Sequence, residues 1–113
     1  MSDTKITYYR GDSYPKVFTI KDANTNQVID LTGYTFIMTV NSLSSPPDDS
    51  TEIFFVPGVV DDPALGMVAF TPTSENNNIT AVTYYYDVQM VSGSIKRTIV
   101  KNDYIITQDI GKT

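Results

Sequence analysis

Acidic side chains come nearest to forming a chemical site in this chain. Asp48-Asp49 with Glu52, and Asp61-Asp62, bring carboxylates together in two segments. Loops that bind Ca²⁺ carry such oxygens at ordered alternate positions around a central glycine, and neither segment has that spacing. A pair of carboxylates can also hydrolyse a glycoside, but these lie on loops and the chain has no tryptophan to form a sugar platform. Solvated loop charge is the favoured interpretation.

Two residue types that dominate active sites are missing. The chain has no histidine and no cysteine, so it lacks the commonest general base, the commonest transition-metal ligand and any thiolate. The sequence therefore predicts no catalytic residue, no cofactor and no metal ligand, and we expect the protein not to be an enzyme.

Two short motifs match known signatures only in part. Gly111-Lys112-Thr113 resembles the end of a phosphate-binding loop, but Ile106 stands where that loop has its first glycine. The loop is also expected to lead into a helix, and the given sequence ends at Thr113, so we do not expect a phosphate site here. Arg10-Gly11-Asp12 is the tripeptide that integrins recognise. The favoured alternative is a tight turn in which Gly11 adopts a positive φ and Asp12 bonds backbone amides beyond it.

Length and charge narrow the class of protein. A chain of 113 residues is expected to form one domain, and its net charge of −5 argues against binding to nucleic acid. No apolar run is long enough to span a membrane, and the N-terminus lacks the apolar region of a signal peptide. Every Lys and Arg lies at or before Lys21 or at or after Lys96. This segregation is either chance or a sign that basic terminal strands lie opposite acidic middle loops.

The elements that must position these residues are strands. Runs of alternating apolar and polar residues, separated by turn signals, predict an all-β, antiparallel sandwich of about seven or eight strands, or a small barrel. Single helical turns are expected near 61–65 and 74–80. We expect strands at roughly 5–9, 15–22, 34–42, 52–56, 66–71, 82–91, 95–101 and 103–108. The residues expected inside are Phe18, Ile20, Tyr34, Phe36, Met38, Val68, Phe70, Tyr84, Tyr86 and Val88.

Three consecutive tyrosines mark the strand at 82–91. In a strand, Tyr84 and Tyr86 point to one face and Tyr85 to the other. The inward pair is expected to fill the core, with a tyrosine corner in which a phenol bonds the backbone. Tyr85 is a candidate contact residue on the outer face.

The segment 53–60 is apolar on both faces of a strand. Ile53 and Phe55 share one face, and Phe54 and Val56 share the other. A two-layer sandwich buries only one face, so we expect another protein subunit to cover the second. Phe54 and Val56 are the predicted partner-interface residues, with Tyr85 a lesser candidate.

The order of several short motifs carries a family resemblance over nearly the whole chain. The motifs are Arg10-Gly11-Asp12-Ser13, Asp30-Leu31-Thr32-Gly33-Tyr34, Gly66-Met67-Val68-Ala69-Phe70, Tyr84-Tyr85-Tyr86-Asp87-Val88, Arg97-Thr98-Ile99 and Asp109-Ile110. This order resembles the small immunoglobulin-like β-sandwich at the N-terminus of phage baseplate upper proteins and related tail and virion proteins of tailed phages. In the baseplate upper proteins longer regions follow the module, whereas this chain stops after it.

The resemblance implies a non-enzymatic structural protein of a tailed-phage virion. It would be a tail or baseplate adaptor or a capsid decoration subunit that docks to other virion proteins. We expect it to form a homo-oligomer or to be present in symmetric copies in the particle, and to be assembled in the host cytoplasm. Neither a nucleic acid nor a membrane is an expected partner. The alternative is a carbohydrate- or receptor-binding β-module that uses outward tyrosines.

Overall fold

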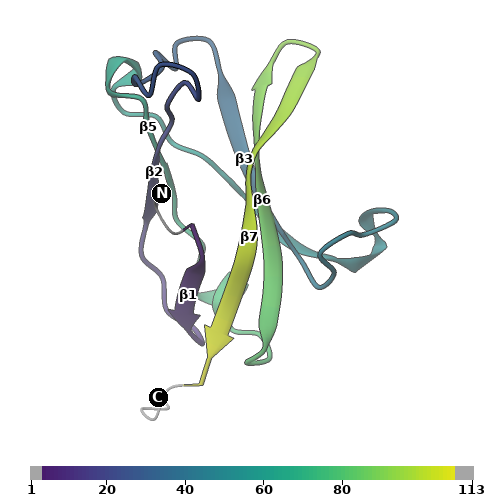
Figure 1. Ribbon diagram of the computed structural model, residues 1–113. Coiled ribbons are helices and arrows are strands. Elements are labelled where there is room, and N and C mark those ends of the chain that lie inside the picture. Colours follow the sequence, from purple (N-terminus) through teal and green to yellow (C-terminus); the bar gives the residue numbers. More distant parts are fainter. Residues whose placement is uncertain (1–3, 109–113) are drawn as a thin grey trace.

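The computed structural model describes residues 4–108, which form a two-layer β-sandwich (Figure 1). The larger layer is a five-stranded sheet with the strand order β1-β7-β6-β3-β4, and the smaller layer pairs β2 with β5. The strands are β1 (Ile6–Tyr9), β2 (Lys16–Thr19), β3 (Thr35–Asn41), β4 (Glu52–Pro57), β5 (Met67–Phe70), β6 (Thr83–Ser92) and β7 (Ile95–Thr107). The predicted all-β sandwich is confirmed.

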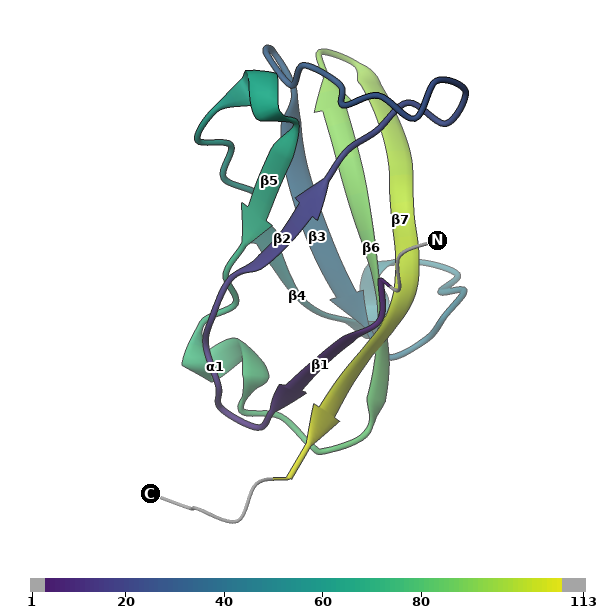
Figure 2. The ribbon, with the colours of Figure 1, turned by 60° about the vertical axis from the view of Figure 1, so that its left-hand side comes forward.

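Strands β7, β6, β3 and β4 lie side by side in that order in the large sheet, with β4 at its free edge. All neighbouring strands are antiparallel except β1, which pairs with the end of β7 in parallel, from Ile6 opposite Tyr104 to Tyr9 opposite Thr107. This parallel pair departs from the fully antiparallel prediction. Figure 2 shows β1 beside β7 and the small sheet in front of the larger one.

Three short helical segments join the strands. The predicted helical turns occur as a 3-10 turn at Pro63–Leu65 and as α1 at Ser74–Asn77, and a further 3-10 turn spans Asp49–Thr51. Helix α1 begins with a capping box, in which Thr73 accepts a hydrogen bond from the Asn76 N–H and the Asn76 side chain accepts one from the Thr73 N–H. Within residues 4–108, no helix is long and apolar enough to cross a membrane.

The strands predicted at 95–101 and 103–108 are one strand. No turn residue separates them, and the pairing with β6 accommodates an irregularity instead: Val88 lies opposite Val100, but Gln89 lies opposite Thr98. Ile99 is the extra residue of this β-bulge, which lets β7 continue for 13 residues.

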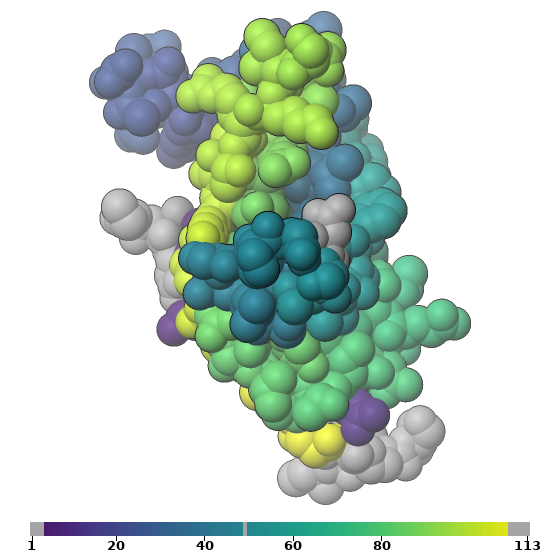
Figure 3. All heavy atoms as spheres, turned by 90° about the vertical axis from the view of Figure 1, so that its right-hand side faces the viewer, coloured from purple at the N-terminus to yellow at the C-terminus, as the bar shows by residue number. Residues whose placement is uncertain are grey.

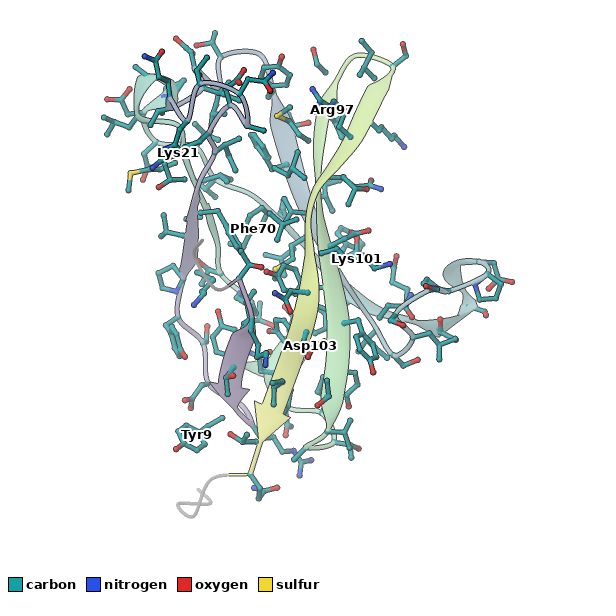
Figure 4. The ribbon with its side chains drawn as sticks, viewed as in Figure 1. Tyr9, Lys21, Phe70, Arg97, Lys101 and Asp103 are labelled. Carbon is teal, nitrogen blue, oxygen red and sulfur yellow. The ribbon has the colours of Figure 1, made fainter. Side chains whose placement is uncertain are left out.

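The core lies between the two sheets and follows the predicted alternation closely. Nine of the ten side chains expected inside are buried, and Figure 4 shows Phe70 between the layers. The exception is Tyr34, which is 36% exposed because it lies in the turn before β3, where its N–H donates to the Leu31 carbonyl. Leu31, which is 1% exposed, fills the core at that end instead.

The chain crosses from the large sheet to the small one at Gly58. A Cβ atom there would lie 2.7 Å from Val68 Cγ2 and 2.9 Å from Phe36 Cβ, so only glycine fits between the layers. This crossing holds the end of β4 in place, because the Gly58 N–H donates to the Phe36 carbonyl at 2.8 Å.

Candidate docking surfaces

The buried tyrosines have structural roles. Tyr84 donates to the Thr80 carbonyl at 2.8 Å, four residues upstream, which is the geometry of a tyrosine corner. Tyr8 donates to the Tyr14 carbonyl at 2.7 Å, and burial raises the Tyr8 pKa to about 12. Tyr86 donates to the Thr4 carbonyl. The predicted tyrosine corner is confirmed, and these phenols help to hold the sandwich together.

The Arg10-Gly11-Asp12 segment is a turn held by α1. Gly11 has a φ of +84°, as the turn interpretation predicts. Its N–H donates to the Asn77 carbonyl at 2.9 Å, and Asn77 Nδ2 donates to the Asp12 carbonyl at 2.7 Å. Tyr104 donates to Oδ1 of the same fully buried Asn77. The backbone of Asp12 makes these contacts, rather than its carboxylate as predicted, and the result is a turn anchored to the core.

The acidic loop residues cap backbone turns. Asp48 Oδ1 accepts a hydrogen bond from the Ser50 N–H at 2.9 Å, and the Asp48 pKa is lowered by its hydrogen bonds with Ser50. Asp62 Oδ1 accepts from the Ala64 N–H at 3.1 Å at the start of the second 3-10 turn. Among the acidic side chains that the structure describes, no three come together in a cluster that could hold a metal ion. The Asp49 side chain lies outside the described part. The Gly111-Lys112-Thr113 motif lies outside the described residues.

Strand β4 orients opposite to its prediction. Val56 is 5% exposed and lies opposite the buried Met38, while Phe54 lies opposite the buried Val40 and packs edge-on against Tyr104, with ring centroids 5.7 Å apart. Both predicted interface residues therefore point inward. The residues that point outward are Ile53 and Phe55, which are 40% and 60% exposed.

The outer face of β4 continues onto β3. Thr39 lies directly opposite Phe55 and Ile37 opposite Pro57, and Ile37 is also exposed. Ile53, Phe55, Pro57 and Ile37 thus form one apolar surface at the end of the large sheet, which we call the β4 face. Within strand β4, this outer face is the one that remains for a partner to cover.

Tyr85 does point outward, as predicted. It is half-buried on the outer face of β6, beside a polar hollow of about 280 Å³. The loop before β4 forms one wall, and in Figure 3 that loop projects over the outer face of the large sheet. The side chains around the hollow come from Thr39, Asn41, Leu43, Ser44, Pro46, Asp48, Glu52, Tyr85, Tyr86, Asp87, Gln89 and Lys101.

The charges at the hollow are mixed. Asp87 lies opposite Lys101 in the β6–β7 ladder. Burial raises the pKa of the Asp87 carboxyl, and the nearby Lys101 ammonium partly opposes that shift. Lys101 therefore shares this hollow with Asp48 and Glu52, against the predicted separation of basic and acidic sides. Figure 4 also places Lys21 beside the small sheet, away from Arg97 and Lys101 on β7.

A second apolar surface covers the outer face of the small sheet. Val17 and Val59 both lie opposite Ala69 of β5, and Met67 lies two residues before Ala69 on the same strand. Val17, Val59 and Met67 are between 44% and 58% exposed. This surface was hard to predict from the sequence, because β2 and β5 are four residues each and Val59 joins β5 through an isolated bridge.

No protein-family model matches the chain, and no curated protein matches it in sequence. A functional assignment therefore has to rest on the residues and on the surfaces described above.

Proposed function

We propose that this chain is a non-enzymatic structural protein of a tailed-phage virion, acting as a tail or baseplate adaptor or as a capsid decoration subunit. It docks to other virion proteins and is present in symmetric copies, assembled in the host cytoplasm. The order of motifs that resembles the baseplate upper proteins supports the class of protein. The exposed β4 face supports the mode of action, which is docking rather than chemistry.

The β4 face is the observation that carries this proposal. Phe55 is 60% exposed on an end strand of the sheet, next to Ile53 and Ile37. End strands in proteins that stay monomeric are usually guarded by charge, and between Ile53 and Val56 this strand has none. Covering one large apolar side chain stabilises a contact by about 1.5–3 kcal/mol, and symmetry repeats that gain at every copy.

Substitution of Phe55 tests the proposal in particles that carry the chain. Phe55→Asp should leave the isolated domain folded, since the side chain lies outside the core, and should abolish incorporation into particles. Leu65→Asp is the matched control, because Leu65 is 56% exposed on the second 3-10 turn, away from β4, and should incorporate normally. Normal incorporation of Phe55→Asp would show that the β4 face does not dock.

The polar hollow favours the second candidate, a carbohydrate- or receptor-binding module. Tyr85 offers an aromatic ring, and Asn41, Gln89 and Asp87 offer hydrogen-bonding groups of the kind that bind sugar hydroxyls. Glycan-array binding by the isolated domain that disappears in Tyr85→Ala would favour this candidate over docking. Docking would be favoured if the isolated domain bound no glycan and Phe55→Asp failed to be incorporated into particles.

A further inference from the structure

Both ends of the large sheet have an open edge. Strand β4 has no neighbour on the side away from β3 within residues 4–108. At the other end, β1 covers only Tyr104–Thr107 of β7, so the described part of the chain pairs no strand with residues 95–103 on that side. Figures 1 and 2 show the upper half of β7 extending beyond β1.

The β4 edge directs backbone groups outward at Phe55. The hydrogen bond from the Gly58 N–H to the Phe36 carbonyl fixes the alternation of the β3–β4 ladder. By that alternation, Phe54 and Val56 turn their backbone groups toward β3, and Phe55 turns its N–H and C=O away. Pro57 then ends the run, because it has no N–H to donate.

The β7 edge directs backbone groups outward at Lys101. The hydrogen bond from the Ile106 N–H to the Val82 carbonyl fixes the alternation on this side. Lys101 and Asp103 consequently turn their backbone groups away from β6. The Asp103 N–H already donates to Asn102 Oδ1 at 2.7 Å, so the edge available to another strand lies at residues 95–101.

The two edges carry opposite charge. Between Ile95 and Lys101 the charged residues are Lys96, Arg97 and Lys101, and all three are exposed. Glu52 begins β4 and Asp48 lies in the loop before it, and no Lys or Arg occurs between Lys21 and Lys96. Two copies of the β7 edge repel each other, whereas the β4 edge of one copy attracts the β7 edge of another.

The strand directions also match. Strands β7, β6, β3 and β4 alternate in direction, so β4 runs opposite to β7. A second copy in the same orientation therefore presents its β7 antiparallel to β4, without being inverted. The six residues of β4 and the seven at 95–101 are of comparable length.

We propose that β4 of one copy pairs antiparallel with residues 95–101 of β7 in a second copy, so that the large sheet continues from copy to copy. The contact is head-to-tail, and it produces a ring if the rotation closes and a filament if it does not. The inference concerns the purified chain alone and holds whether or not the protein belongs to a virion.

Two edge variants test this pairing. Phe55→Asp removes the apolar side chain from the β4 edge and leaves a carboxylate that the contact would have to bury. Lys96→Glu/Arg97→Glu reverses the charge of the β7 edge. The controls are Leu65→Asp for the first and Arg10→Glu/Lys21→Glu for the second, which change the same charges at exposed positions off both edges. Far-ultraviolet circular dichroism and thermal melts establish that each variant is folded.

Sedimentation of the separate and mixed proteins measures whether the copies associate through these two edges. Wild type and both controls should form species larger than a dimer as concentration rises, weakened by salt, and the dissociation constant should rise about tenfold or more in each edge variant. An equimolar mixture of the two edge variants should form a 1:1 dimer that does not grow, because each supplies the edge that the other lacks. The proposal would be overturned by a wild type that stays monomeric or by a mixture that stays monomeric. It would also be overturned if Lys96→Glu/Arg97→Glu alone associated with itself as strongly as the wild type does.

Discussion

The two open edges of the large sheet differ in how they are protected against pairing with another strand. The exposed part of β7 carries Lys96, Arg97 and Lys101. Cations on an unpaired edge strand repel the same edge of another copy and so oppose edge-to-edge pairing. Strand β4 has only Glu52 at its start and Pro57 at its end, with Ile53 and Phe55 exposed between them. The exposed apolar residues of β4 are therefore not a general property of the edges of this sheet. Exposed apolar side chains on β4, at the opposite side of the sheet from the cation-lined edge of β7, are best explained by a partner.

The largest expected effect separates the two faces of β4. Val56→Asp should unfold the protein, because burying an unpaired carboxylate costs about 4 kcal/mol or more. Phe54→Ala should cost about 2–3 kcal/mol, since Phe54 is only partly buried, while Phe55→Ala should stay within about 0.5 kcal/mol. Urea unfolding of the dilute proteins measures all three, and an equal cost for Phe54→Ala and Phe55→Ala would contradict the assignment of the faces.

The same inward and outward comparison applies to neighbouring tyrosines of β6. Tyr84→Phe removes the hydrogen bond to the Thr80 carbonyl, so the free energy of unfolding should fall by about 1 kcal/mol. Tyr85→Phe changes a hydroxyl at the hollow and should have little effect. If thermal melts show that Tyr85→Phe destabilises the protein more, the outer face of β6 contributes more to stability than we infer.

The smallest effect is a pH dependence at Asp87. Burial raises its pKa in the folded state, so the wild-type stability linked to this group is complete below its unfolded pKa of about 3.9 and is lost as pH rises through the raised folded value. Asp87→Asn does not titrate. The stability of the variant relative to wild type should therefore increase from acid to neutral pH, as measured by urea unfolding across that range. A relative stability that decreases over the same range would reverse the sign of the burial effect.

Most of the fold could be predicted from the sequence because alternation is unambiguous where one face is polar. Phe36, Met38 and Val40 alternate with less buried residues, and all three lie in the core. The turn signal at Gly11 and the tyrosine corner at Tyr84 were also readable, since each depends on residues close in the sequence.

The orientation of β4 could not be predicted, because both of its faces are apolar. Which face enters the core is decided by the opposition of Phe54 to Val40 and of Val56 to Met38. That register includes an irregularity between Val40 and Asn41, and the local sequence does not predict it. The hollow at Asp87 and Lys101 likewise joins residues from β3, β6, β7 and the loop before β4, and only the folded chain brings them together.

Hydrogen exchange at the Phe55 amide reports whether β4 pairs with a second copy of the chain. The neighbouring Phe54 and Val56 amides point toward β3 and serve as internal references that should be protected at every concentration. The Phe55 amide should exchange rapidly in dilute protein, become protected as concentration rises, and lose that protection in Lys96→Glu/Arg97→Glu. A Phe55 amide that exchanges at the same rate at all concentrations would contradict the account, because the β4 edge would then remain open.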